Sequence, residues 1–120
     1  MSKQDPPNPY EFLKVQGVPG VEASADDEQH SLNITDSNQE TAIIITRKTG
    51  EYWYGGFQFY WHHGNTSYKR PDPANGLFRS ERETRLYYIG YLSLFLDYYL
   101  EDTKSSIKSA LLEFSQQTLF

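Results

Sequence analysis

Residues 41–70, TAIIITRKTG EYWYGGFQFY WHHGNTSYKR, contain the strongest structural signal in this chain of 120 residues. β-Branched and aromatic residues fill the segment, and polar stretches interrupt it at 48–50 and 63–65. This pattern is typical of consecutive antiparallel hairpins. We therefore predict strands over 41–47, 51–62 and 66–70, with Gly50 supplying the positive φ of the first turn. Alternation of Leu32 and Ile34 predicts a fourth, edge strand over 31–35.

The central strand has two different faces, because successive side chains point to opposite sides of a sheet. The face that we expect to meet the core carries Trp53, Gly55, Phe57, Phe59 and Trp61. The face that we expect to be half exposed carries Tyr52, Tyr54, Gly56, Gln58, Tyr60 and His62. The Gly55-Gly56 pair in the middle of the strand predicts either a bulge or a close approach of another segment to bare backbone.

Two helices follow the sheet in the sequence. Ser80 and Glu83 form a capping box that opens a helix running to about residue 101. The second helix starts at Thr103 or Ser105 and reaches about residue 115. Its expected apolar face consists of Ile107, Ala110, Leu111 and Phe114. The predicted fold class is α+β, an antiparallel meander sheet of three or four strands packed against two C-terminal helices.

The domain organisation is simple. Residues 1–7 are polar, contain two consecutive prolines and read as a disordered lead. Residues 8–120 form a single domain that opens with a short helix over 8–15, with 116–120 as a free tail if that end does not pack. From Leu86 to Leu100 only Gly90, Ser93 and Asp97 are not apolar. A helix of this kind needs cover on several sides, which predicts a homodimer through it. The alternative is that its tyrosine hydroxyls face water.

Composition limits the functional classes. The net charge is −5, but residues 47–85 carry seven basic and four acidic residues. Only that third could attract nucleic acid, because such binding depends on cations. The chain has no cysteine, which excludes disulfides and cysteine-based metal sites. We expect neither a signal peptide nor a membrane span, and hence a cytoplasmic protein.

The last five residues are Gln116, Gln117, Thr118, Leu119 and Phe120. This pentapeptide resembles the short segment by which bacterial replication and repair proteins dock on the DNA sliding clamp. The resemblance implies that Leu119 and Phe120 fill an apolar cleft on the clamp while Gln116 hydrogen-bonds at its edge. Gln117 and Thr118 depart from the residues often found there. Alternatively, Leu119 and Phe120 continue the second helix and join the protein's own core.

A second interpretation places single-stranded nucleic acid on the half-exposed sheet face. Bases stack on aromatic side chains of a sheet while neighbouring cations hold the phosphates. The residues that could act in this way are Tyr52, Tyr54, Tyr60, Arg47, Lys48, Lys69 and Arg70. Tyrosines on such a face also pack against one another across strands without any ligand.

Catalytic and metal-binding patterns are weak. His62 and His63 are neighbours on a strand and point to opposite faces, so they do not form a metal pair. His30 is the third histidine, and no nucleophile motif is present. We therefore expect no cofactor and no metal. The sequence predicts a small non-enzymatic interaction module of bacterial, phage or mobile-element origin that docks on the sliding clamp, with nucleic-acid binding or a domain of unknown function as alternatives.

Overall fold

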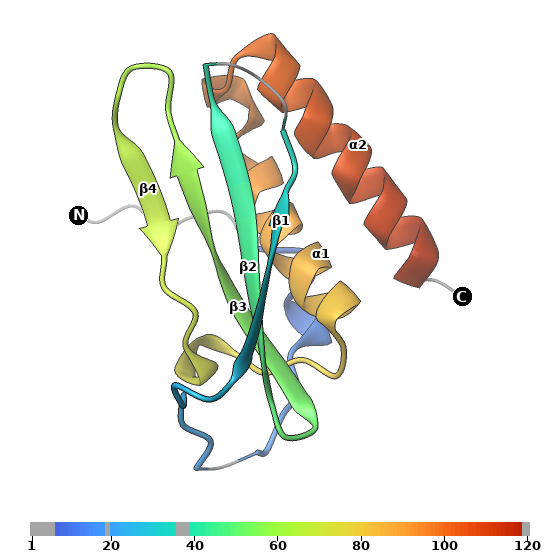
Figure 1. Ribbon diagram of the computed structural model, residues 1–120. Helices are drawn as coiled ribbons and strands as arrows, with labels where there is room; N and C mark the ends of the chain where they lie inside the picture. Colours follow the sequence, from blue (N-terminus) through green and yellow to red (C-terminus); the bar gives the residue numbers. More distant parts are fainter. Residues whose placement is uncertain (1–6, 19, 36–38, 119–120) are drawn as a thin grey trace, which may run out of the picture.

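A computed structural model describes residues 7–18, 20–35 and 39–118 (Figure 1). Within them, a four-stranded sheet precedes two α-helices, and three short 3-10 helices occupy the connections. The strands are β1 (Glu28–Asn33), β2 (Thr41–Thr49), β3 (Tyr52–Tyr60) and β4 (Thr66–Lys69). The helices are η1 (Glu11–Leu13), η2 (Pro73–Asn75), α1 (Glu81–Leu92), η3 (Ser93–Tyr98) and α2 (Glu101–Thr118).

The strands are antiparallel and lie in the order β1-β2-β3-β4, which confirms the predicted α+β meander. The turn between β2 and β3 is Gly50-Glu51, with Gly50 at φ 59°, so β2 extends two residues beyond its predicted end. The edge strand begins at Glu28, three residues earlier than predicted, because its ladder with β2 continues to Lys48. Both α-helices lie on one side of this sheet (Figure 1).

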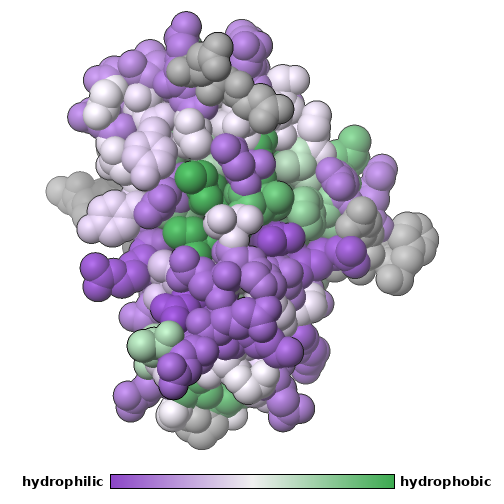
Figure 2. Space-filling model, viewed as in Figure 1, coloured by the Kyte–Doolittle hydropathy of each residue, from purple (hydrophilic) through white to green (hydrophobic). Residues whose placement is uncertain are grey.

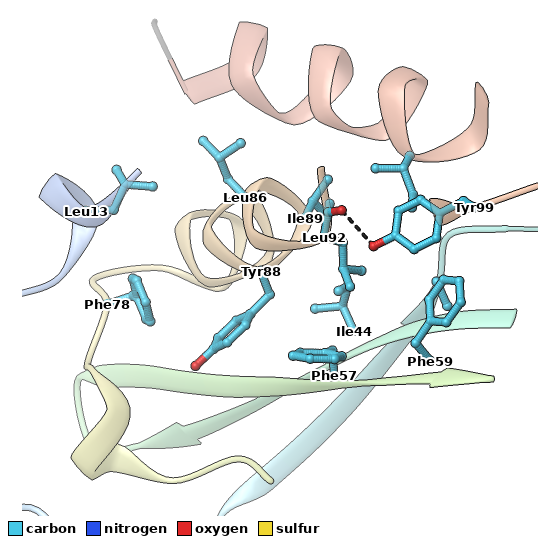
Figure 3. Packing of buried hydrophobic residues seen from close by; sticks show 12 residues of the cluster. Leu13, Ile44, Phe57, Phe59, Phe78, Leu86, Tyr88, Ile89, Leu92 and Tyr99 are labelled. Atoms are coloured by element: carbon cyan, nitrogen blue, oxygen red, sulfur yellow. Dashed lines mark hydrogen bonds between the residues drawn. The ribbon is translucent and has the colours of Figure 1, made fainter. Parts of the chain in front are cut away.

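The core lies between the sheet and the helices. Figure 3 shows Tyr88 pointing from α1 toward β3, while Leu86 on the same helix points toward α2. Phe57 and Phe59 of β3 are buried beneath α1, as the alternation of that strand predicts. Fully burying an aliphatic or aromatic side chain stabilises a protein by about 1.5–3 kcal/mol, so this layer supplies most of the driving force for folding.

Gly55 and Gly56 lie in a regular ladder, opposite Thr46 and Ile45, so of the two predicted alternatives the close approach is correct. A Cβ on Gly55 would lie 2.7 Å from Cγ2 of Thr84 on α1. On the opposite face, a Cβ on Gly56 would lie 2.0 Å from the backbone oxygen of Lys69. Because neither glycine has a side chain, α1 packs closely on one face of β3. The chain at the end of β4 crosses the opposite face.

The predicted single helix through residues 86–100 is wrong. α1 ends at Leu92, and the chain then kinks at Phe95, where φ is −119° and ψ 28°. Tyr99 is extended and buried, and its hydroxyl donates a hydrogen bond of 2.7 Å to the carbonyl of Leu92 (Figure 3). The break lets α2 fold back over α1. α2 and the sheet cover part of this segment, while Tyr98 stays 70% exposed, so the homodimer through residues 86–100 stays a prediction.

Two smaller expectations also need correction. The N-terminal helix over 8–15 is only the 3-10 turn η1, although the Asn8 side chain does accept a hydrogen bond from the amide of Tyr10. The second helix starts at Glu101 and continues to Thr118, longer at both ends than predicted.

We predict that Gly56→Ala destabilises the protein by about 3 kcal/mol, the upper end of the usual cost of overpacking. The added methyl group would meet backbone atoms of Lys69 and Pro71, which cannot rotate away as a side chain would. Urea denaturation followed by tryptophan fluorescence measures the change. Gln58→Ala, on the same face of β3, serves as the control and should change stability by less than about 0.5 kcal/mol. Equal stability of the two variants would contradict the described packing.

Candidate functional site

A groove of about 640 Å³ runs between the edge strand β1 and helix α2. Leu32, Asn33 and Ile34 form one wall. The other wall is the stripe of α2 made by Asp102, Ser105, Ser106, Ser109, Ala110, Glu113 and Phe114. Figure 2 shows an apolar area at the centre of this face of the molecule, and Figure 1 shows that α2 diverges from β1 toward its C-terminal end.

Small side chains on α2 keep the groove open. Ser105, Ser106, Ser109 and Ala110 recur at helical spacing, so they share the face that looks toward β1. Ile107, on a different side of the helix, is completely buried. α2 therefore packs through its larger residues on α1 and η3, and leaves short side chains opposite the strand. Large side chains at the serine positions would fill this space.

The outer edge of β1 exposes hydrogen-bonding groups of the backbone. The amide of Ile34 donates a hydrogen bond to the carbonyl of Ala42. The backbone amides and carbonyls of the even-numbered residues of this strand therefore point toward β2. By the alternation of an antiparallel ladder, the amides and carbonyls of Gln29, Ser31 and Asn33 point away from the sheet. No backbone partner for these groups exists among the described residues. The groove thus lies beside an unpaired strand edge.

His30 fastens β1 to the start of α1. Its Nδ1 lies 2.6 Å from Oε2 of Glu81, and its Nε2 lies 2.6 Å from Oε2 of Glu28. Carboxylates only accept hydrogen bonds, so the doubly protonated imidazolium satisfies both contacts. The hydrogen bond to Glu81 raises the pKa of His30 above its usual 6.5, with a smaller contribution from Glu28.

Glu81 gathers several groups around one carboxylate. Burial alone would raise its pKa, but hydrogen bonds from Thr46 and His30 and the charge of Arg85 outweigh burial and lower it. The Thr46 hydroxyl donates to Glu81 over 2.7 Å. Because Thr46 is completely buried, this hydroxyl cannot meet a substrate. The cluster therefore holds the edge strand in place and offers no accessible nucleophile at Thr46.

Glu40 fastens the start of α2 to the far end of the sheet. Its buried carboxylate binds the His62 imidazole and accepts a hydrogen bond of 3.1 Å from the Leu100 amide. Burial tends to raise the pKa of Glu40, but the hydrogen bonds from His62, Leu100 and Thr103 outweigh it and hold the pKa below its usual value. Glu40 therefore fixes the start of α2, while His30 fixes β1 against α1.

The charged side chains that line the groove are both acidic. Asp102 lies near the start of α2 and Glu113 lies three turns further along. The basic residues of α2, Lys104 and Lys108, line a different surface of the helix. A ligand of this groove therefore meets an apolar centre with a negative charge toward each end.

The structure separates the residues of the predicted nucleic-acid face. Tyr54 is completely buried, against the prediction that it is half exposed, and its hydroxyl donates to Asp27. Burial, and then the hydrogen bond to Asp27, raise the pKa of Tyr54 to about 12. The Arg47 guanidinium donates to the carbonyls of Ser24 and Asp27. Neither side chain is available to a base or a phosphate.

The remaining members of that face point in different directions. Lys48 and Lys69 lie opposite Trp53 and Phe57, which places both lysines on the helix side of the sheet. Tyr60 is 42% exposed, Tyr68 67% exposed, Tyr52 half-buried and Arg70 exposed. Of the predicted cations, Lys48 and Lys69 therefore lie on the opposite side of the sheet from the open tyrosines.

The residues of the clamp-like peptide are only partly described. Gln116 is exposed in the last turn of α2, and the helix continues to Thr118. Leu119 and Phe120 lie outside the described residues. The predicted free tail over 116–120 is therefore helical where it is described.

The histidine pair that the sequence left open has two separate structural roles. His62 binds Glu40, while the His63 ring stacks on Trp61 at 5.5 Å between ring centres. In the described part of the chain, no group of three potential ligands could hold a metal ion. Sequence reasoning missed the groove itself. The signal available in the sequence was the helical spacing of Ser105, Ser106 and Ser109 on α2.

No protein-family model matches this sequence, and comparison with curated proteins and with solved structures likewise gave no match. Among the helices of the described residues, none has the length and apolar character needed to cross a bilayer.

We predict that the stabilising contribution of His30 depends on pH. Its folded pKa is raised, so the contribution is fully present below the ordinary value of 6.5 and is lost as the pH rises through the folded value. Urea denaturation at a series of pH values should show that His30→Gln has a lower free energy of unfolding than wild type at low pH. This difference should shrink as the pH rises.

The matched control is the same substitution in a Glu81→Gln background. There the pH dependence of the His30→Gln effect should largely disappear, because the main partner of the imidazolium has lost its charge. A disadvantage of His30→Gln that grows with rising pH would contradict the described cluster.

Proposed function

We propose that the protein is a non-enzymatic interaction module that takes up a segment of a partner protein in the groove between β1 and α2. The observation that carries this proposal is the groove itself, which lies beside the unpaired outer edge of β1. Its volume is in the range of about 300–1,000 Å³ typical of ligand sites. Its apolar floor and small-residue wall suit the side chains of a peptide.

This proposal has better support than nucleic-acid binding. The acidic residues Asp102 and Glu113 at the groove repel phosphates, and Tyr54 and Arg47 are engaged within the protein. Nucleic-acid affinity depends on cations that replace condensed counterions. Lys48 and Lys69 lie on the helix side of the sheet, away from the tyrosines of the open face, and cannot provide that contribution there.

Selection from a random peptide display library tests the proposed function. We expect selected peptides to bind the wild-type protein and to lose at least about tenfold in affinity, or about 1.4 kcal/mol, to Ser109→Trp, which fills the groove. Leu112→Trp is the matched control, since it adds the same ring to an exposed position of α2 away from the groove. A library in which every binder tolerates Ser109→Trp would overturn the proposal.

Docking on the bacterial sliding clamp is the second candidate function. Gln116, Leu119 and Phe120 match the clamp-binding pattern, and Gln116 is exposed at the end of α2. A bacterial, phage or mobile-element origin and a cytoplasmic location would follow from this partner.

We predict that deletion of Leu119 and Phe120 abolishes binding to a bacterial clamp while the free energy of unfolding changes by less than about 0.5 kcal/mol. Binding is measured by surface plasmon resonance and stability by urea denaturation. Gln116→Ala should weaken binding without abolishing it, because it removes only the hydrogen bond at the cleft edge. A large loss of stability on deletion would instead assign both residues to the protein's own core.

A further inference from the structure

We infer that the occupant of the groove is an extended, basic segment that adds a fifth strand to the outer edge of β1. The inference rests on the function proposed above and specifies the chemistry of the partner. It follows from two features of the described residues, namely the unpaired strand edge and the acidic charges that line the groove.

The strand edge dictates an extended backbone. Gln29, Ser31 and Asn33 present outward amides and carbonyls that are already spaced for a ladder. A partner strand satisfies them with its own backbone, whatever its side chains, which is the basis of β-strand addition. A helix lying in the same groove would leave these groups unpaired.

The alternation of a strand then divides the partner's side chains between two sides. Partner residues opposite Leu32 and Ile34 point into the groove, because paired residues share a face of the sheet. Partner residues opposite Gln29, Ser31 and Asn33 point to the open face and meet water. Every second partner residue therefore faces the groove and is apolar or charged. The partner residues between them are polar.

The acidic lining of the groove favours a basic partner. Both charged residues among those that line it, Asp102 and Glu113, are acidic. A basic side chain of the partner that points into the groove meets these carboxylates, while an apolar one meets Leu32 and Ala110.

A second copy of the protein fits the groove poorly. Pairing β1 with β1 of another molecule would bring together two grooves that are lined only by acidic charges. The chain as a whole carries a net charge of −5, which opposes self-association further. A cationic segment of a different protein supplies the complementary charge.

The probe is the blocked peptide acetyl-Thr-Lys-Thr-Val-Thr-Lys-Thr-amide, titrated by calorimetry and by nuclear magnetic resonance. We expect saturable binding in which amide hydrogen exchange slows at least about tenfold at residues 29, 31 and 33. Replacing both lysines of the peptide by glutamate should abolish binding. Asp102→Asn with Glu113→Gln should weaken it by about tenfold, the scale of two exposed ion pairs.

Backbone methylation of the peptide tests strand addition directly. Alternate peptide nitrogens face β1, so methylating one alternate set should abolish binding while methylating the other set should leave it within about twofold. On the protein, Ser31→Pro removes one outward amide and spares the ladder to β2, and proline is tolerated on an edge strand. Ser31→Pro should abolish binding, and Ser31→Ala should not.

Three results would overturn the inference. They are equal effects of the two methylation sets, tight binding of the glutamate peptide, and a concentration-dependent mass of twice 14.0 kDa with residues 29, 31 and 33 protected in the absence of peptide. If library peptides bind in a groove-dependent manner but do not protect β1, only the strand-addition inference fails. If no peptide is sensitive to Ser109→Trp, the proposed function fails with it.

Discussion

The close approach of α1 to the bare backbone of β3 at Gly55 governs the arrangement of the whole molecule. Because Thr84 of α1 lies directly over Gly55, this helix occupies the middle of the sheet. α2 then packs its apolar residues on α1 and η3 and lies to one side of α1. The groove is a consequence of that displacement, since a helix packed on top of α1 cannot also fill the space beside the edge strand.

Two polar clusters fix the positions of β1 and of the start of α2. His30 joins the edge strand to α1 through Glu81, and Glu40 joins the first turn of α2 to the end of the sheet through the Leu100 amide. Both clusters centre on a carboxylate that the protein stabilises in its charged form. A buried carboxylate with several directed partners tolerates little displacement, because a lost hydrogen bond leaves a charge without compensation. The β1 wall of the groove and the start of its α2 wall are therefore held in place.

Much of the architecture could be predicted from local patterns. The hairpins between residues 41 and 70 follow from alternation and turn glycines, and Ser80 does cap α1 by accepting a hydrogen bond from the amide of Glu83. The break after Leu92 could not be predicted in this way. Nothing in the apolar run 86–100 marks a helix end, and the stop depends on Tyr99 reaching back to the Leu92 carbonyl and on Glu40 binding Leu100. Contacts between residues distant in the chain have no local signature.

The tyrosines show the same limit. Alternation correctly placed Tyr54 on the face of β3 away from the helices, but its burial comes from Asp27 and the segment around η2, which cross that face. By itself, the sequence determined the strands, their order and the α+β class, because these depend on periodicity and turn chemistry within a few residues. Only the tertiary structure decided which tyrosines are covered, where the long helix breaks and that an open groove remains beside β1. These features result from how large and small side chains of separate elements pack together. The distance between the two walls of the groove cannot be read from the sequence of either wall.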